Sequence, residues 1–363
     1  MNKIVVTGAT SMIGVATINE AIKNNVEVLA IVRTGSKKIN RLPKSKLIKV
    51  LECDIDQFDS IDISQLSIKH LDEKNNWIAT ASRKPRNDEY TSNKVDDNQT
   101  YKTNHTNLNQ NNLIATASTK PRNDGFDYEV FYHFAWGNID KSTRNDPVLQ
   151  EKNIKYTLDA VNLAKKLGCK KFVGAGSQAE YGRVEGKLTP LTPINPDIAY
   201  GMAKYAAGRL TNLRCKELGI EHIWTRILSV YGIYDNPSTM ISYAINELLA
   251  GREPEFTKCE QKWDYLFSED AGKAFFLIGE KGKVNKTYCL GSGIARPLAD
   301  YVKTINKLLD KSENMGIGKK DYAPNQVMHL EADITELIND TGFKPSYTFE
   351  EGLRKTIAWA KNN

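Results

Sequence analysis

The sequence has few cysteines, and nothing in their spacing pairs them. Five occur in 363 residues, and no two of them form a Cys-x-x-Cys pair. A disulfide framework needs cysteines at close and regular spacing, and so does a typical zinc site. The scatter argues against both and favours a reducing compartment. The five residues are Cys53, Cys169, Cys215, Cys259 and Cys289.

Long apolar runs and blocks of like charge are also missing. The first apolar stretch, Ile4-Val5-Val6, is soon followed by Gly8, which makes it too short for a signal peptide, and no later stretch approaches the length of a membrane span. The 50 basic residues are dispersed among 44 acidic ones, and the formal net charge is +6. Such a surface suits phosphorylated ligands better than nucleic acid. We therefore expect a cytoplasmic protein with no membrane or nucleic-acid partner.

The chain does contain a regular alternation of strand-like and helix-like segments, the pattern of a doubly wound parallel α/β sheet of the Rossmann type. Residues 1–228 are expected to form a dinucleotide-binding domain whose sixth strand closes the sheet, and residues 229–363 mainly a smaller substrate-binding domain. The predicted strands cover 4–6, 26–32, 47–53, 129–134, 170–175 and 221–228, the predicted helices 14–25, 152–167 and 198–217, and the smaller domain adds a strand over 286–290 and helices over 297–309 and 349–361.

A glycine-containing turn joins the first strand to the first helix, with the spacing Gly8-x-x-Ser11-x-x-Gly14. Such a turn lets a pyrophosphate approach backbone N–H groups at a helix N-terminus, where the macrodipole favours negative charge. The spacing differs from the Gly-x-Gly-x-x-Gly fingerprint, and a tight connection without a ligand would look the same. The candidate cofactor contacts in this turn are Gly8, Thr10, Ser11, Met12, Ile13 and Gly14.

The end of the second strand carries a base where many dinucleotide-binding proteins carry an acid. An acid at this point accepts the ribose 2′-OH of NAD, whereas a base accommodates the 2′-phosphate of NADP. Here the residue is Arg33, and Ser36, Lys37 and Lys38 follow it. The pattern predicts NADP(H) in preference to NAD(H), although a merely polar loop is the alternative.

About seventy residues separate the third predicted strand from the fourth, far more than a crossover needs. Within this interval, residues 75–88 recur as residues 111–124 with two changes. A helical repeat array would need at least three units with an apolar face. We therefore interpret residues 65–127 as a polar, mostly disordered surface insert that resembles translated repetitive DNA, with a partner-binding loop as the alternative.

Three residues in the fifth strand and the helix after it form a candidate catalytic set. Tyr200 and Lys204 have the i,i+4 spacing that places both on one helix face. The lysine ammonium is expected to depress the pKa of the tyrosine, which could then exchange a proton with a sugar oxygen while a hydride moves to or from a nicotinamide. Ser177, at the end of the fifth strand, would polarise the reacting carbonyl. A second Tyr-x-x-x-Lys match, Tyr90 to Lys94, lies inside the insert with no strand before it, and we dismiss it.

These features together resemble the NAD(P)-dependent epimerase/dehydratase family, the nucleotide-sugar branch of the extended short-chain dehydrogenases/reductases. The resemblance covers nearly all the chain except the insert. The segments that carry it are Thr7 to Gly14, His133 to Trp136, Ser177 to Gly182, Pro196 to Lys204, Arg226 to Gly232, Trp263-Asp264-Tyr265 with Asp270-Ala271, and Asp333 to Trp359.

The resemblance implies further contacts and an oligomeric state. Asp54 and Ile55 would lie against the adenine, and Phe134, Ala135 and Trp136 beside the cofactor, with core packing the alternative for Trp136. Lys204 would hold the nicotinamide ribose. The helix pair over 152–167 and 198–217 would build a homodimer. Gln178, Ser229 and Lys262 are substrate candidates that could equally be plain surface residues.

Within the family, sugar 4,6-dehydratases carry an acid two residues before the Tyr-Gly that follows the catalytic Ser or Thr. That position is Ala179 here, preceded by Gln178, which argues against dehydration. We expect an enzyme that uses NADPH to reduce a nucleotide-linked 4-keto-6-deoxy sugar, with segment 176–182 similar to that of CDP-linked deoxysugar synthases. An NAD-dependent nucleotide-sugar epimerase is the alternative. A non-catalytic NAD(P)-binding protein, or an enzyme inactivated by the insert, is the second alternative.

Overall fold

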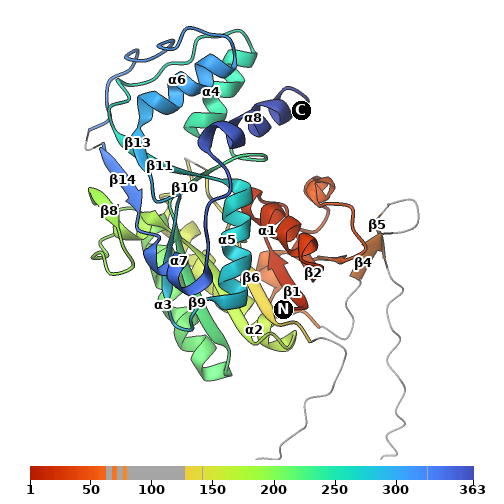
Figure 1. Cartoon of the computed structure of the whole chain (residues 1–363). Helices are drawn as coiled ribbons and strands as arrows, with labels where there is room; N and C mark the ends of the chain where they lie inside the picture. Colours follow the sequence, from red (N-terminus) through yellow and green to blue (C-terminus); the bar gives the residue numbers. More distant parts are fainter. Residues whose placement is uncertain (63–67, 72–76, 80–126, 141, 325) are drawn as a thin grey trace, which may run out of the picture.

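The computed structural model describes residues 1–62, 68–71, 77–79, 127–140, 142–324 and 326–363. Most of the expected insert, residues 65–127, therefore lies outside the described residues, and so does the dismissed Tyr90 to Lys94 match. Two lobes are visible in Figure 1, a large sheet flanked by helices and a smaller lobe that carries the C-terminus. In the described part of the chain, no helix is both long and apolar enough to cross a bilayer.

The large sheet contains nine strands among the described residues, in the order β12-β9-β7-β6-β1-β2-β3-β4-β5. All strands from β12 to β3 run parallel, with β1 between β2 and β6. This is the doubly wound sheet that the alternating pattern predicts. Its strands are β1 (Lys3–Thr7), β2 (Glu27–Val32), β3 (Ile48–Glu52), β4 (Ile68–Leu71), β5 (Trp77–Ala79), β6 (Val130–His133), β7 (Lys171–Ser177), β9 (Glu221–Ile227) and β12 (Thr287–Leu290).

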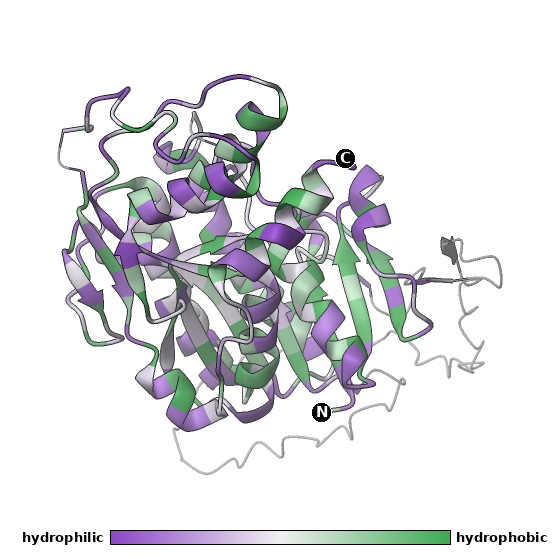
Figure 2. Cartoon of the chain, turned by 45° about the horizontal axis from the view of Figure 1, so that its top comes forward, coloured by the Kyte–Doolittle hydropathy of each residue, from purple (hydrophilic) through white to green (hydrophobic). Residues whose placement is uncertain are grey.

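Helices cover both faces of this sheet, which is why its strands are apolar on both sides. On one face α1 (Met12–Lys23) packs against α5 (Ser268–Lys281), and on the other α2 (Pro147–Lys166) packs against α3 (Ala199–Leu218). Successive residues of β1 alternate between the two hydrophobic cores, because side chains along a strand point to opposite faces. Figure 2 shows the hydrophobic strands inside and the hydrophilic outer surfaces of the helices.

The smaller lobe is built on a second sheet, in the order β10-β11-β14-β8, with β13 paired to β11. A third hydrophobic core joins this sheet to three helices. The strands are β8 (Gly186–Leu188), β10 (Ser229–Tyr231), β11 (Lys262–Phe267), β13 (Ala295–Pro297) and β14 (His329–Ala332), and the helices are α4 (Met240–Leu249), α6 (Leu298–Leu308) and α8 (Phe349–Ala360). A further helix, α7 (Thr335–Thr341), contacts α5 and β12.

One expectation about the sheet is wrong, and the strands cross the expected domain boundary. The sixth predicted strand, β9, does not close the sheet, because β12 pairs with it in parallel over Thr287 to Leu290. The expected boundary at residues 228 and 229 is crossed in both directions: β8 joins the second sheet, while α5 and β12 belong to the large one.

The N-terminal part of the expected insert contains two strands. Residues 68–71 form β4, which pairs antiparallel with β3, and residues 77–79 form β5, which pairs antiparallel with β4. These strands extend the sheet at the edge beyond β3. No strand was expected in these two segments, and most of residues 65–127 lies outside the described residues.

Candidate active site

The turn between β1 and α1 is built for close backbone approach. Gly8 has φ of +62°, and a Cβ there would lie 2.7 Å from the Ala135 nitrogen. A Cβ on Gly14 would collide with the carbonyl oxygen of Gly8. Ser11 caps α1 by accepting the Gly14 N–H at 3.1 Å, which leaves its own hydroxyl proton free to donate. Ser11 therefore caps α1 while its hydroxyl can still donate to a phosphate at the helix N-terminus.

A groove of about 470 Å³ runs from this turn to the end of β2, and we call it the basic groove. Arg33, Lys37 and Lys38 line it, and none of the three pairs with an acid of the described residues. On the opposite side, Ala135 and Trp136 line the same groove. The groove thus joins the N-terminus of α1 to a cluster of free cations, an arrangement that suits a dinucleotide with several phosphates.

The other expected cofactor residues divide into two groups. Gly8, Thr10 and Ile55 line the basic groove, whereas Met12 and Ile13 line a separate cavity. Asp54 begins the short helix η2 (Ile55–Gln57) and does not appear among the described lining residues. Phe134 packs edge-on against Phe275 with 4.7 Å between ring centroids, so it forms the wall behind the turn.

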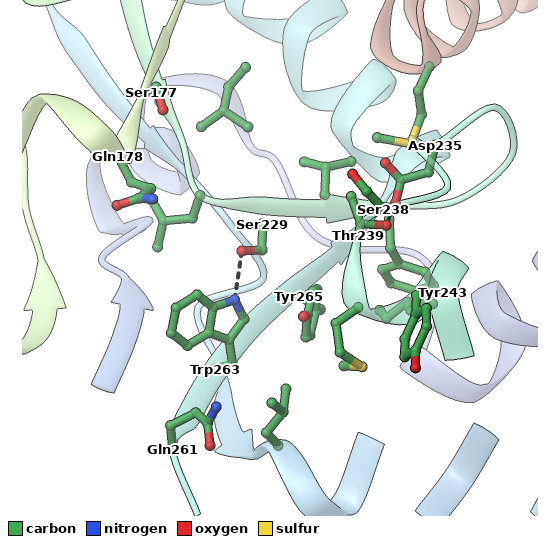
Figure 3. A pocket seen from close by; sticks show the side chains of 18 of the residues that line it. Ser177, Gln178, Ser229, Asp235, Ser238, Thr239, Tyr243, Gln261, Trp263 and Tyr265 are labelled. Carbon is green, nitrogen blue, oxygen red and sulfur yellow. Dashed lines mark hydrogen bonds between the residues drawn. The ribbon is translucent and has the colours of Figure 1, made fainter. Parts of the chain in front are cut away.

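A larger cavity of about 860 Å³ lies between the two lobes, and we call it the central cavity. Figure 3 shows Ser177 and Gln178 at one end, Asp235, Ser238, Thr239 and Tyr243 at the other, and Ser229 and Trp263 between them. Trp263 donates its indole N–H to the Ser229 hydroxyl at 2.7 Å. Met12, Ile13 and Tyr200 also line the central cavity, which therefore reaches from the glycine turn into the smaller lobe.

Tyr200 lies in the first turn of α3 and faces the central cavity together with Ser177. Burial raises the pKa of Tyr200, while the Arg144 guanidinium and a hydrogen bond with Ser177 act in the opposite direction. Arg144 lies 4.4 Å from the centroid of the Tyr200 ring. Ser177 also accepts the Ala179 N–H at 3.2 Å, so its own hydroxyl proton can be donated to another oxygen.

Lys204 lies closer to Trp136 than to Tyr200. Its ammonium donates to the Ala175 carbonyl at 2.6 Å and lies 3.7 Å from the centroid of the Trp136 ring, but 5.8 Å from that of Tyr200. Burial lowers the pKa of Lys204 to about 7, against the opposing effect of Glu180. The expectation that Lys204 depresses the pKa of Tyr200 stays a prediction, and Arg144 is the cation nearer to the Tyr200 ring.

A fully buried carboxylate fixes the corner that presents Ser177. Glu180 accepts hydrogen bonds from the Ser177 N–H at 2.9 Å, the Trp224 indole at 3.0 Å and the Arg226 guanidinium at 2.9 Å. It belongs to the short helix η4 (Gln178–Tyr181), which a capping box begins. Glu180 therefore points away from the cavity and serves the backbone of this corner.

Two polar residues on the buried face of α2 hold the loop after β6. Gln150 accepts the Trp136 indole N–H at 3.0 Å and donates to the Asn138 carbonyl at 2.7 Å. Asn153 bonds both the N–H and the carbonyl of Gly137. Because of these bonds, Trp136 has a fixed position between the basic groove and Lys204.

The three expected substrate residues have different positions. Gln178 and Ser229 line the central cavity, whereas Lys262 is exposed and does not appear among the described lining residues. Gln261, the residue before β11, is buried and lines the cavity instead. His133 bonds Thr7 at 2.9 Å, and burial lowers its pKa to about 3, so it is a neutral part of the wall.

Several residues of the site were missed by reasoning from the sequence. Gln150 and Asn153 were detectable in principle, as polar residues three apart on the buried face of α2. Arg144 and Asp235 lie in irregular segments, where no periodicity points to them. Burial raises the pKa of Asp235 to about 6, and its carboxylate accepts the Thr239 hydroxyl at 2.8 Å.

Comparison with known proteins gives these features a family. The model of the NAD dependent epimerase/dehydratase family matches residues 4–107 and 64–291, which is most of the chain. The chain belongs to this family. The resemblance on which the sequence analysis relied is thereby confirmed.

Curated members of the epimerase/dehydratase family match part of the chain. A dTDP-glucose 4,6-dehydratase of Xanthomonas campestris pv. campestris is 28% identical over 204 residues, which are 53% of this chain and 58% of that protein. The dTDP-glucose 4,6-dehydratase 1 of Escherichia coli K12 is 30% identical over 183 residues, which are 48% of this chain and 51% of that protein. The chain thus spans little more than half the length of the curated relatives that it matches.

Solved structures of the same kind share the whole fold. A UDP-glucose 4-epimerase from Thermotoga maritima, in a structure with UDP-glucose, has a TM-score of 0.72 at 19% identity and covers 99% of both chains. A dTDP-glucose 4,6-dehydratase from Bacillus anthracis, in complex with NAD, has a TM-score of 0.70 at 18% identity. The match covers 100% of this chain and 97% of the dehydratase chain. At such low identities the likeness concerns the fold and not the reaction.

Proposed function

We propose that this protein is a nicotinamide-dependent oxidoreductase that acts on a nucleotide-linked sugar. The observation that carries the proposal is that Ser177 and Tyr200 line one cavity with Met12 and Ile13 of the glycine turn. A reacting sugar carbon and the nicotinamide must meet within such a space. Membership of the epimerase/dehydratase family supports this assignment.

The residues fit a dinucleotide in an order that follows the two cavities. The turn over Gly8 to Gly14 would hold the pyrophosphate, and the basic groove, with Ile55 on its wall, the adenosine half. Asp54 is proposed beside the adenine. Trp136 would flank the nicotinamide end. When bound, the cofactor would supply the hydride chemistry that the side chains of this chain lack.

The acid-base chemistry is assigned to three side chains. Tyr200 would hold the proton that moves to or from the sugar oxygen, and Ser177 would donate a hydrogen bond to the same oxygen. Lys204 would hold the nicotinamide ribose, since its ammonium lies beside Trp136 at the end of the basic groove. Gln178 and Ser229 would contact the sugar from the cavity wall.

The finer proposal is that the reaction is the NADPH-dependent reduction of a 4-keto-6-deoxy sugar. Elimination of water would need a separate acid and base beside Ser177, but the residues there are Gln178 and Ala179. The nearest acid, Glu180, is buried and bonded to Arg226. The free cations Arg33, Lys37 and Lys38 support NADPH, because they suit a 2′-phosphate.

An epimerase that retains NAD is the second candidate. It is favoured by membership of the NAD dependent epimerase/dehydratase family. An epimerase would oxidise and re-reduce one carbon within a turnover, with the same Tyr200 and Ser177. The two candidates differ in whether the reduced cofactor is consumed.

The experiment is a turnover assay that counts the cofactor. The protein is mixed with NADPH and with CDP- or dTDP-linked 4-keto-6-deoxy sugars, and absorbance at 340 nm and product mass are followed. Stoichiometric loss of NADPH with a product two mass units heavier supports the reductase. Interconversion of a nucleotide sugar and its 4-epimer without net change at 340 nm supports the epimerase. Absence of both activities in protein that binds the cofactor contradicts both candidates.

We also propose that the protein is a homodimer formed through α2 and α3. These helices pack side by side and expose large apolar side chains: Val148, Met202, Leu210 and Leu213. Apolar residues grouped on a helix pair support a protein contact. A Leu213→Glu variant should sediment as a monomer if this face forms the dimer, and an unchanged dimer would exclude it.

A further inference from the structure

Arg144 is a cation that the proposed mechanism leaves without a role. It lines the central cavity with Ser177 and Tyr200, and its guanidinium carbon lies 4.4 Å from the centroid of the Tyr200 ring. Its Nε is buried without a hydrogen-bond partner, and no acid of the described residues pairs with it. An arginine placed in this way is free to act on the tyrosine and on what enters the cavity.

The segment that carries Arg144 is fastened on both sides. Asn145 accepts the N–H of Ala199, the first residue of α3, at 2.8 Å, so the loop is tied to the helix turn that presents Tyr200. Asp146 caps α2 by accepting two N–H groups. The Arg144 N–H itself donates to the Asp140 carbonyl at 2.8 Å. Because these contacts fix the loop against α3, Arg144 is held over Tyr200 by the fold.

The charged groups near Tyr200 come from three elements. Arg144 comes from the loop before α2, Glu180 from η4, and Lys204 from α3 itself. Glu180 is already bonded to Arg226, and Lys204 is bonded to the Ala175 carbonyl and stacked on Trp136. Arg144 is therefore the one of the three that no described partner occupies.

We propose that Arg144 is a positioning residue that favours the ionised form of Tyr200 more strongly than Lys204 does, since it lies 4.4 Å from the ring centroid against 5.8 Å for Lys204. A cation within about 4 to 6 Å of an acid favours its charged form. The positive end of α3, where Tyr200 lies in the first turn, acts in the same direction. Lys204 keeps the separate task of holding the ribose. This inference rests on the proposed function, because it concerns the same tyrosine.

The test is the ionisation of Tyr200 itself, measured on the full-length protein. Tyrosine labelled with ¹³C at Cζ is followed by NMR from pH 7 to the pH at which the fold is lost, and the Tyr200 signal is assigned by its absence in Tyr200→Phe. Arg144→Gln should move the midpoint up by about one pH unit. Arg144→Lys should restore most of the shift, and Lys204→Met should move the midpoint less than Arg144→Gln does.

The control is Arg183→Gln, at an arginine that pairs with Asp197 outside the cavity, and it should leave the midpoint unchanged. A Tyr200 midpoint that is the same in Arg144→Gln and wild type would overturn the proposal. So would a wild-type Tyr200 that stays neutral until the fold is lost, or a larger shift in Lys204→Met. If Arg144→Gln does not fold, Arg144→Met, which also removes the charge, should show the same upward shift of the midpoint.

This readout separates the inference from the proposed function, because the titration needs no turnover. If the enzyme is active, the pH at which its rate changes with the ionisation of Tyr200 should shift together with the NMR midpoint. Protein that shows the Arg144 shift but no turnover would contradict the proposed function alone. Turnover with no Arg144 shift would contradict this inference alone.

Discussion

At the scale of single residues, Tyr200 combines burial with two nearby cations, Arg144 and Lys204, and one hydroxyl, that of Ser177. Burial favours its neutral form, while Arg144 and Ser177 favour the ionised one. Such a balance is typical of side chains that exchange protons during a reaction. Within the candidate set, the Tyr200 phenol is the group proposed to transfer a proton, whereas Ser177 would donate a hydrogen bond and Lys204 would hold the ribose.

Removing this oxygen gives the first prediction. Tyr200→Phe should lower turnover by about 100-fold to 10,000-fold, the usual contribution of a positioned acid or base. Cofactor affinity should stay within a few fold, because the ring and its contact with Trp136 remain. Steady-state rates and cofactor titration on the same preparation check this. Undiminished turnover would remove Tyr200 from the mechanism.

Lys204 makes a prediction about stability. Its pKa falls from 10.5 to about 7 on burial, so between these pH values the unfolded chain binds one proton more than the folded chain does. Burial of Lys204 therefore destabilises the fold most below pH 7, where the ammonium is charged in both the folded and the unfolded chain. The stability of the fold rises as the pH increases from 7 toward 10.5.

Lys204→Met should accordingly raise the free energy of unfolding at pH 6 by about 1 kcal/mol or more. The gain should shrink as the pH rises, and turnover should be lost. Denaturant unfolding at pH 6 and pH 9 checks both points, with Lys216→Met, at an exposed position of the same helix, as the control. A variant less stable than wild type at pH 6 would show that the bonds to Ala175 and Trp136 outweigh the cost of burial.

Sequence reasoning at the residue scale succeeded where a residue belongs to a regular element. Tyr200 and Ser177 follow from their places on α3 and at the end of β7, and they line one cavity. Arg144 could not be predicted, because its position over Tyr200 depends on a loop held by a contact between residues 145 and 199. Lys262 is exposed while Gln261, just before β11, is buried, and the sequence pattern did not resolve this difference of one residue.

At the scale of elements, the turn between β1 and α1 depends on the absence of a side chain at Gly8. An added Cβ would lie 2.7 Å from the Ala135 nitrogen and 2.8 Å from the Phe134 carbonyl carbon. Both atoms belong to the backbone of the segment after β6, which cannot yield as a flexible side chain can. The turn and this segment therefore hold one another in place.

Gly8→Ala should weaken cofactor binding by about tenfold or more, equivalent to about 1.4 kcal/mol. The matched control is Gly219→Ala, because Gly219 has φ of +67° but nothing within 4 Å of an added Cβ. Both variants carry the cost of a left-handed residue, and only Gly8→Ala adds the collision. Equal affinity in the two variants, measured by NADPH fluorescence, would show that the turn does not contact the cofactor.

The parallel strands and long helices of the large sheet were predictable, because apolar runs and helical spacing are read over many residues. The second sheet was not, since β8, β10 and β13 have three residues each and pair with partners distant in sequence. The same limit explains why β12 was expected in the smaller domain. Its sequence predicts a strand, but only tertiary pairing with β9 decides which sheet it joins.

At the scale of the whole molecule, the site is built without the insert. None of the described residues that line the basic groove or the central cavity falls between 59 and 134. The described strands β4 and β5 extend the sheet beyond β3, at the opposite end from β12. The division into domains at residue 228 stays a prediction, although β8 and β12 cross it.

Deleting residues 65–127 should therefore leave turnover within a few fold of wild type. A shorter deletion of 80–126, joined by a short Gly-Ser linker, keeps β4 and β5 and serves as the matched control. If only the longer deletion lowers the thermal midpoint, the cause is the loss of the strand paired to β3. Loss of turnover in both deletions, with the fold intact by circular dichroism, would give the insert a role in the reaction.

The measurement that tests the account most directly is cofactor binding by the freshly purified protein. Any nucleotide released on denaturation is identified, and NADPH and NADH are then titrated by fluorescence. The account predicts empty protein that prefers NADPH, and an Arg33→Ala variant that loses the preference while NADH affinity stays the same. Protein that is purified with tightly held NAD, or that binds NADH as well as NADPH, would contradict the reductase and leave the epimerase as the function to pursue.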